Sequence, residues 1–191
     1  IQLFDGQNLS LIDALAIEDW GLFKDLLKAE NVIKVLHSCS EDLEVFWHQF
    51  KTMPAPLFDT QFAAGLAGVG HSVGYAKLVA DMLQVELDKG ESRTDWLQRP
   101  LRSEQLDYAA NDVIYLYQLY PLLHEKLQTE EREDWVFQEM AQLAHKKSHP
   151  IPPDFHYLSI KNNWQLFGKS LMVFKELAAW RMNKALSLIH I

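Results

Sequence analysis

The segment Leu106–Tyr120 constrains the fold of this chain most, because it combines helical spacing with an almost uncharged composition. It reads LDYAANDVIYLYQLY, and after Asp107 its only charged residue is Asp112, which apolar and aromatic residues flank on both sides. Tyr108 lies four residues before Asp112 and therefore shares a helix face with it. The segment predicts a long helix, capped by Ser103, that carries a carboxylate and a phenol on one buried face.

Two interpretations of Asp112 and Tyr108 stay open at this point. A buried carboxylate is costly unless something positive meets it. In the first interpretation the two groups hold a cation and a water molecule. In the second, Asp112 pairs with an arginine from elsewhere and Tyr108 fills the core. A four-residue spacing is a weak motif, so the helix alone does not decide between them.

A second acidic cluster lies at the start of another predicted helix. Ser38 followed by Glu41 matches a capping box, and apolar residues then recur at helical spacing up to Phe50. Glu41 and Glu44 lie on the polar stripe, whereas Asp42 borders the apolar stripe. We expect Asp42 to face inward at the end of the preceding strand. The alternative is that Asp42 only complements the helix dipole in the first turn.

Three further polar residues have simpler explanations. Asp59 precedes a predicted helix at Thr60, where an N-cap accounts for it. His37 ends a strand, and we expect a supporting role or a substrate contact at most. Cys39 is the only cysteine, so no internal disulfide can form, and a reducing cytosol fits best. We expect Cys39 to be a small packing residue.

The loop Leu87–Leu101 brings the cations Lys89, Arg93 and Arg99 together with Trp96. Cations beside an aromatic ring can hold phosphates and stack a base. The simpler account is that Trp96 pins the loop and the cations offset nearby acids. We expect Trp96 to be structural, and we retain Lys89 and Arg99 as candidate substrate contacts.

The charge of the chain is uneven. The formal net charge is −8, which argues against a protein that simply coats nucleic acid. Residues 1–153 carry −11 and residues 154–191 carry +3. This distribution suits an acidic catalytic body joined to a substrate-holding module, although ordinary surface variation is the simpler explanation of charge alone. The sequence has no stretch with the apolar length of a membrane span.

The order of predicted elements indicates a mixed α/β fold, with strands early and helices late. A β-hairpin is expected over 1–12, and short strands at 31–36 and just before residue 59. Further helices are expected at 19–28, 60–66, 75–83 and, after Pro121 ends or kinks the long helix, up to about 147. The proline-containing stretch 148–154 indicates a linker, and 164–185 indicates an amphipathic helix with its lead-in.

Together these segments resemble ribonuclease D, a family of 3′→5′ exonucleases with four acidic metal ligands and a tyrosine. The second exonuclease motif is similar to HSCSEDLEVF, with Asp42 as its acid. The third, in the form Y-x-x-x-D, is similar to YAANDVIYL, with Tyr108 and Asp112. The most specific feature is the run DKGESRTDWLQRPLRSEQLDYAA, which resembles the stretch leading into the third motif. NNWQLFGKSLMVFKELAAWRMNKA resembles the opening of the family's helical C-terminal domain.

This resemblance implies a domain organisation. Residues 1–147 would form an α/β exonuclease domain, with a ribonuclease-H-like mixed sheet flanked by helices. Residues 148–160 would be a linker, and residues 161–191 the start of a helical RNA-binding domain of the HRDC type.

The resemblance also implies a metal-dependent mechanism. Two divalent cations, Mg²⁺ or Mn²⁺, would clamp the scissile phosphate. Asp112 would bind the ion beside the nucleophile, Asp42 would serve the second ion partly through water, and Tyr108 would orient or help deprotonate the attacking water. Nucleoside 5′-monophosphates would leave one at a time from the 3′ end of an RNA, with tRNA precursors as the expected substrates in the cytoplasm. Oxygen ligands agree with these ions rather than with zinc.

The sequence departs from the family in two places. The first exonuclease motif, an Asp-x-Glu on the first strand, is expected shortly before Ile1 and is absent. The last residues, LSLIHI, do not continue the family's helix. We therefore expect a chain cut at both ends that lacks the strand between 1–4 and 31–36. With two of four carboxylates, we expect it to be inactive alone and marginally stable.

Two other classes of protein remain in play. A 3′→5′ DNA exonuclease of the proofreading or Werner type shares the same motifs. A non-catalytic RNA-binding relative is the other rival, but a pure binder has no need of Asp42, Tyr108 and Asp112.

Overall fold

The computed structural model describes residues 1–88 and 90–188, with side chains described up to residue 185. The chain divides into two compact units, one over Ile1–Ser148 and one that begins at His149. No helix in the part of the chain that the structure describes is long and apolar enough to cross a membrane.

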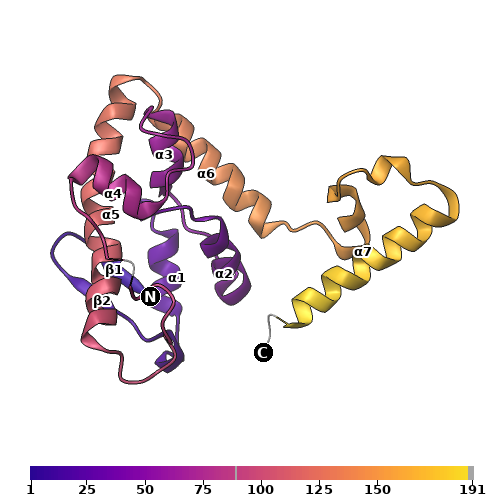
Figure 1. Ribbon diagram of the computed structural model, residues 1–191, viewed down its shortest axis with the longest axis horizontal. Helices are drawn as coiled ribbons and strands as arrows, with labels where there is room; N and C mark the ends of the chain where they lie inside the picture. The colour runs from indigo at the N-terminus through magenta and orange to yellow at the C-terminus, as the bar shows by residue number, and fades with distance from the viewer. Residues whose placement is uncertain (89, 189–191) are drawn as a thin grey trace. The chain divides into compact units, whose positions relative to one another are not determined.

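The first unit contains most of the helices and all the described strands (Figure 1). In chain order its elements are β1 (Gln2–Phe4), β2 (Leu9–Leu11), the 3₁₀ turn η1 (Ala14–Ala16), α1 (Gly21–Lys28), β3 (Lys34–Leu36), α2 (Ser40–Phe50), β4 (Leu57–Asp59), α3 (Thr60–Leu66), α4 (Tyr75–Leu83), α5 (Ser103–Thr129) and α6 (Glu133–Ser148). The order of short strands followed by helices confirms the mixed α/β prediction.

The strands form two separate two-stranded pieces. β1 and β2 pair antiparallel, with Leu3 opposite Ser10, which confirms the predicted hairpin. β3 and β4 pair parallel, with Val35 opposite Phe58. Both pieces contact α5, the longest helix. Among the described residues, no ladder joins β1 to β3.

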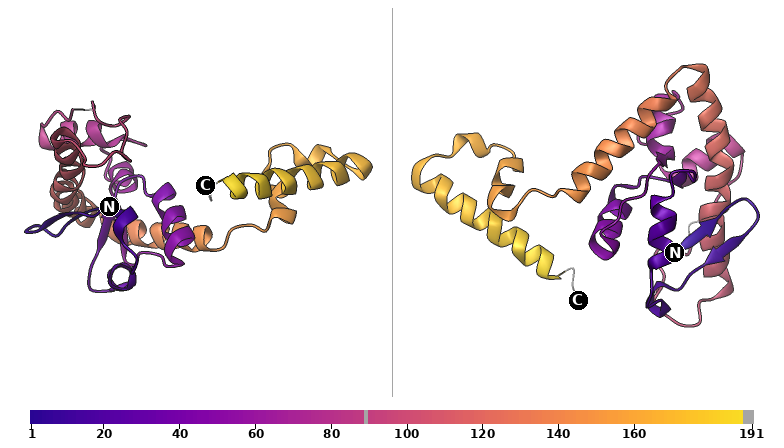
Figure 2. Two further views of the ribbon diagram at one scale, coloured as in Figure 1. Left: turned by 90° about the horizontal axis from the view of Figure 1, so that it is seen from below. Right: turned by 180° about the vertical axis from the view of Figure 1, so that it is seen from behind.

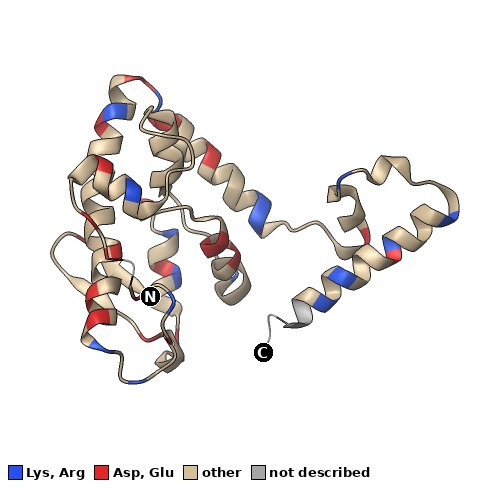
Figure 3. Cartoon of the chain, viewed as in Figure 1, with Lys and Arg blue, Asp and Glu red and all other residues tan. Residues whose placement is uncertain are grey.

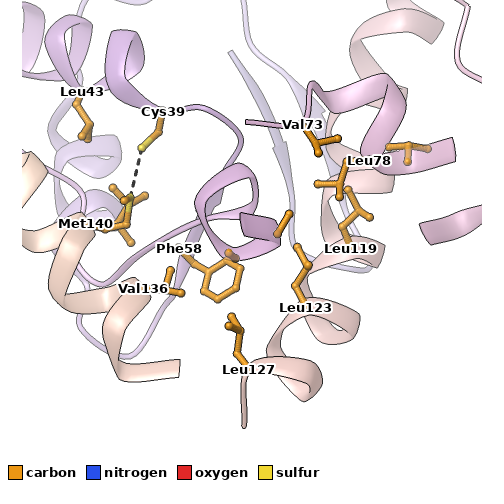
Figure 4. Close-up of a cluster of buried hydrophobic side chains, with 14 of the residues drawn as sticks. Cys39, Leu43, Phe58, Val73, Leu78, Leu119, Leu123, Leu127, Val136 and Met140 are labelled. Atoms are coloured by element: carbon orange, nitrogen blue, oxygen red, sulfur yellow. Dashed lines mark hydrogen bonds between the residues drawn. The ribbon is translucent and has the colours of Figure 1, made fainter. Parts of the chain in front are cut away.

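The core of the first unit lies where α5 and α6 meet β4 and α2. Phe58 is fully buried, and its ring meets Tyr120 edge-on with centroids 4.9 Å apart. Leucines spaced four residues apart on α5 point into the same cluster (Figure 4). Cys39 is fully buried and its thiol lies 3.8 Å from the sulfur of Met140, so the prediction of a packing cysteine is confirmed.

Three local predictions are wrong. Ser103 was predicted to cap α5, whereas it is the first residue of that helix and Arg102 is the N-cap. The helix predicted to be capped by Ser38 begins at Ser40, and Ser38 instead adopts a left-handed backbone with φ of 56°. Pro121 neither ends nor divides the long helix, since α5 runs through it to Thr129. Pro121 is exposed, so water can satisfy the carbonyl that loses its helical partner there.

The second unit consists of η2 (Pro153–Ser159), η3 (Asn163–Gln165) and α7 (Gly168–Leu188). Figure 2 shows η2 beside α7, and the two elements pack against one another. The ammonium of Lys175 on α7 lies over the ring of Tyr157, 4.6 Å from its centroid. The stretch expected as a linker therefore contains η2, which belongs to this unit.

Candidate active site

Asp112 lies on α5 among apolar side chains, as the sequence indicated. It is half-buried, and this burial raises the pKa of its carboxyl group to about 6. Among the described residues, no lysine, arginine or histidine forms an ion pair with Asp112. The described side chains thus provide no arginine of the kind that the second interpretation requires.

Tyr108 lies one turn before Asp112 and is also half-buried. Burial and the nearby negative charge of Asp112 raise the pKa of the Tyr108 phenol, so the hydroxyl keeps its proton at neutral pH. The structure therefore brings these two predicted site residues together. The ring of Trp96 packs beside Tyr108, with centroids 6.0 Å apart.

Acidic residues lie in the first turn of α2, the next element after β3 (Figure 3), and Asp42 is one of them. The residue as a whole is exposed, whereas its carboxyl group is partly desolvated. This desolvation is the main cause of its raised pKa, and the negative charges of Glu41 and Asp59 act in the same direction. The expectation that Asp42 faces inward therefore holds for the carboxyl group only in part.

Asp59 does more than the N-cap that the sequence predicted. Its buried carboxylate accepts hydrogen bonds from the backbone amides of Gln61 and Phe62 and so caps α3, as expected. It also accepts from the amides of Ser38 and Cys39, at 3.2 and 2.7 Å. One carboxylate thus holds the beginnings of α2 and α3 together. This second set of bonds replaces the capping box predicted for Ser38.

His37 occupies an internal position between β3 and α4. Its Nδ1 shares a 2.9 Å hydrogen bond with the hydroxyl of Thr60, and its ring meets Tyr75 edge-on at 5.4 Å. Nε2 is buried close to the Val73 carbonyl, without a hydrogen bond of good geometry to any described residue. Burial is the main cause of the lowered pKa of His37. These contacts suit a supporting role, and its contact with substrate stays a prediction.

The loop before α5 is held by its own polar contacts. Trp96 donates from its indole nitrogen to the Glu91 carbonyl, and the buried Gln105 donates to Thr94 and to the Asp95 carbonyl. These contacts confirm that Trp96 pins the loop.

Arg99 and Lys89 are the two candidate substrate-binding cations of this loop. Arg99 forms a two-pronged ion pair with Asp13, at 2.6 and 2.8 Å, and donates to the Trp96 and Gln98 carbonyls. The structure thus gives Arg99 internal partners, and its phosphate contact stays a prediction. Lys89 lies outside the described residues.

Tyr75 links His37, in the connection before α2, to the turn of α5 that carries Asp112. The negative charge of Asp59 contributes an upward shift to the pKa of Asp42 and to the pKa of His37. The His37 ring meets Tyr75, and the Tyr75 hydroxyl donates to the backbone carbonyl of Asp112 at 2.6 Å. Tyr75 was not singled out in the sequence, because an aromatic residue at the start of a helix gives no sign of its partner.

The candidate ligands are of the kind that a hard divalent cation binds, but there are few of them. Two partly desolvated carboxylates and a protonated phenol offer oxygen atoms, which Mg²⁺ and Mn²⁺ prefer. Among the side chains that the structure describes, no group of three or more His, Cys, Asp or Glu gathers closely enough to hold a metal ion.

Comparison with known proteins defines the class to which this fold and site belong. A family model described as 3′-5′ exonuclease matches residues 1–128. The chain belongs to this family, and the predicted α/β nuclease fold is confirmed.

Within the family, the chain is similar to ribonuclease D. It is 51% identical to ribonuclease D of Shewanella sp. (strain ANA-3) over 187 residues, which cover 98% of this chain and 48% of that protein. It matches the crystal structure of Escherichia coli RNase D, an exoribonuclease involved in structured RNA processing, with a TM-score of 0.89 and 40% identity over 97% of this chain and 50% of that one. The predicted resemblance is confirmed.

A more distant match is Brucella melitensis NrnC with bound Mg²⁺, with a TM-score of 0.58 and 31% identity over 66% of this chain and 61% of that chain. The chain spans about half the length of the curated relatives it matches.

Proposed function

We propose that this chain forms part of a 3′→5′ exoribonuclease that removes nucleoside 5′-monophosphates one at a time from the 3′ end of RNA. The observation that carries the proposal is Asp112, a half-buried carboxylate with a raised pKa and no ion-pair partner among the described residues. It lies on the same helix face as Tyr108, in a chain of the 3′-5′ exonuclease family.

Asp112 and Asp42 would hold two divalent cations, Mg²⁺ or Mn²⁺. When bound, such ions generate a nucleophile from water and stabilise both the attacking and the leaving oxygen of the phosphodiester. Tyr108, with its phenol protonated, orients the attacking water by hydrogen bonding. Burial penalises the charged form of Asp112, and a cation beside it would offset that penalty. The bound Mg²⁺ of the relative NrnC supports this choice of ion.

We infer that two carboxylates are too few for activity. The family resemblance implies four acidic ligands, whereas no group of three or more potential ligands gathers among the described side chains. The 191-residue chain on its own should be inactive. Activity should require an Asp-x-Glu strand in addition to Asp42 and Asp112.

The substrate we propose is a structured RNA with a free 3′ end, with tRNA precursors as the first candidates. The involvement of Escherichia coli RNase D in structured RNA processing supports this choice. The basic residues 154–191 would help to hold the RNA. We place the activity in the cytoplasm, where the buried thiol of Cys39 would stay reduced.

The test compares two forms of the protein. One is the 191-residue chain alone, and the other carries the residues that precede the matched region in the Shewanella relative, fused before Ile1. We expect the fused form to shorten a 5′-labelled RNA stepwise with Mn²⁺, and the chain alone to be inactive. Robust trimming by the chain alone would contradict the two-carboxylate argument. Matched RNA and DNA oligonucleotides distinguish the substrates, and faster trimming of DNA would contradict the exoribonuclease proposal.

A further inference from the structure

Tyr75 is the first residue of α4, and its phenol reaches the backbone of α5 at Asp112. The hydroxyl donates to the carbonyl oxygens of Asp112, at 2.6 Å, and Asn111, at 3.1 Å. A helical carbonyl has a second lone pair free for such a bond. The turn of α5 that carries Asp112 is therefore tied to a side chain from another helix.

The ring of the same residue packs on the opposite end of the site. It meets His37 edge-on, with centroids 5.4 Å apart. His37 shares a hydrogen bond with Thr60, whose hydroxyl lies 3.2 Å from the carbonyl of Leu36 at the end of β3. α2, the helix of Asp42, begins four residues after Leu36. Tyr75 thus contacts α5, which carries Asp112, and also His37, which lies in the connection between β3 and the helix of Asp42.

We infer that Tyr75 is a positioning residue that fixes Asp112 relative to the β3 end of the site, with His37 as its support. This inference rests on the proposed function, since it matters for activity only if Asp112 binds metal. A metal site needs its ligands held to within about 0.5 Å. Residues that hold ligands in place typically contribute about 10- to 100-fold in metal affinity or activity. Tyr75 acts through the backbone of Asp112 and touches no reacting atom.

The test is the substitution Tyr75→Phe in the complete gene product that contains these residues. It removes one oxygen atom and keeps the ring on His37. We expect the Kd for Mn²⁺, measured by electron paramagnetic resonance without RNA, to rise about 10-fold. The Mg²⁺ concentration for half-maximal trimming should rise similarly, with the KM for RNA unchanged. Tyr120→Phe is the matched control, because its ring packs on Phe58 and it makes no hydrogen bond to Asp112.

The outcomes separate this inference from the proposed function. An unchanged Mn²⁺ affinity in Tyr75→Phe, with affinity lost in Asp112→Asn, would overturn the inference alone. Unchanged affinity and trimming in Asp112→Asn would overturn both. A second variant, Tyr75→Leu, also removes the contact with His37 and should weaken Mn²⁺ binding further. If Tyr75→Leu fails to fold, Tyr75→Phe still decides the question. Its thermal melt, followed by circular dichroism, should match that of Tyr120→Phe and would show that the variant is folded.

Discussion

At the scale of single residues, burial makes the charged form of the Asp112 carboxyl group unfavourable in the folded protein. Burial raises the pKa of Asp112 to about 6, above the ordinary value of 3.8. The folded protein therefore binds a proton more tightly than the unfolded chain does. As the pH rises from about 4 to about 6, ionisation of this group lowers the free energy of unfolding. The full decrease is present above about pH 6. A purely structural carboxylate would be expected to behave in the opposite way.

The substitution Asp112→Asn should therefore have opposite effects on stability and activity. In EDTA at about pH 8, we expect it to raise the free energy of unfolding by about 1 kcal/mol, after discounting for solvent screening. The gain should vanish below about pH 4, where both side chains are neutral. With metal and RNA, trimming should fall roughly 100- to 1,000-fold, which corresponds to several kcal/mol of lost transition-state stabilisation.

Urea unfolding across this pH range and single-turnover trimming measure the two effects. Asp107→Asn is the control, since Asp107 is exposed on the same helix and should change neither quantity. A loss of stability in Asp112→Asn at about pH 8 would show that the carboxylate has a structural partner after all.

Tyr108 gives the second prediction at this scale. Tyr108→Phe keeps the ring against Trp96 and removes only the hydroxyl that, as we propose, orients the attacking water. We expect kcat to fall about 100-fold, in the range of a single positioned proton-transfer group. The KM for RNA and the Mn²⁺ affinity should change little. Tyr117→Phe, at an exposed position on the same helix, should retain full activity. Equal effects of the two substitutions would argue against a role of Tyr108 in the reaction.

At the scale of elements, Asp59 determines how α2 and α3 begin. Its buried carboxylate accepts from backbone amides at both helix starts, which lie about 20 residues apart in sequence. Because charged hydrogen bonds to buried donors are strong, we expect Asp59→Ala to cost about 2–4 kcal/mol of unfolding free energy. Asp5→Ala removes similar amide bonds at a fully exposed turn, where solvent screens them, and should cost much less than Asp59→Ala. Chemical denaturation checks both, and equal costs would contradict the bridging role.

The contacts of Asp59 also show which helix boundaries can be predicted from the sequence. The bounds of α3 and α4 were predicted correctly, because apolar spacing defines each helix and Asp59 marks the beginning of α3. The start of α2 was not, because its capping group comes from Asp59, which is remote in sequence. Pro121 was predicted to end or kink the long helix, whereas α5 continues through it to Thr129, which the exposure of Pro121 permits. Local patterns predict local structure, whereas bonds between distant elements require coordinates.

The candidate site shows the same division. Asp42, Tyr108 and Asp112 were proposed from motifs that resemble those of the family, and their roles stay predictions. The tie from Tyr75 to the Asp112 backbone had no local signal. The partner of Arg99, Asp13, lies 86 residues away in the chain and could not be predicted from the loop alone.

At the scale of the whole molecule, the two units differ in net charge. Residues 154–191 carry +3, whereas the preceding part carries −11. If the second unit holds RNA, neutralising Lys161 and Lys169 to glutamine should weaken RNA binding. The slope of log affinity against log salt should fall by about 0.7 for each phosphate that the protein no longer neutralises. Fluorescence anisotropy at several salt concentrations measures this slope. Lys77→Gln in the first unit should leave it unchanged, and an unchanged slope in the double variant would contradict the role of this unit.

The central claim is that Asp112 binds a divalent cation at which RNA is hydrolysed. The most direct measurement is Mn²⁺ binding and 3′-end trimming by the complete gene product, compared with its Asp112→Asn and Asp107→Asn variants. We predict release of single nucleoside 5′-monophosphates by the parent protein and by Asp107→Asn, with both metal affinity and trimming lost in Asp112→Asn. Full trimming by Asp112→Asn, or trimming that persists in EDTA, would contradict the claim.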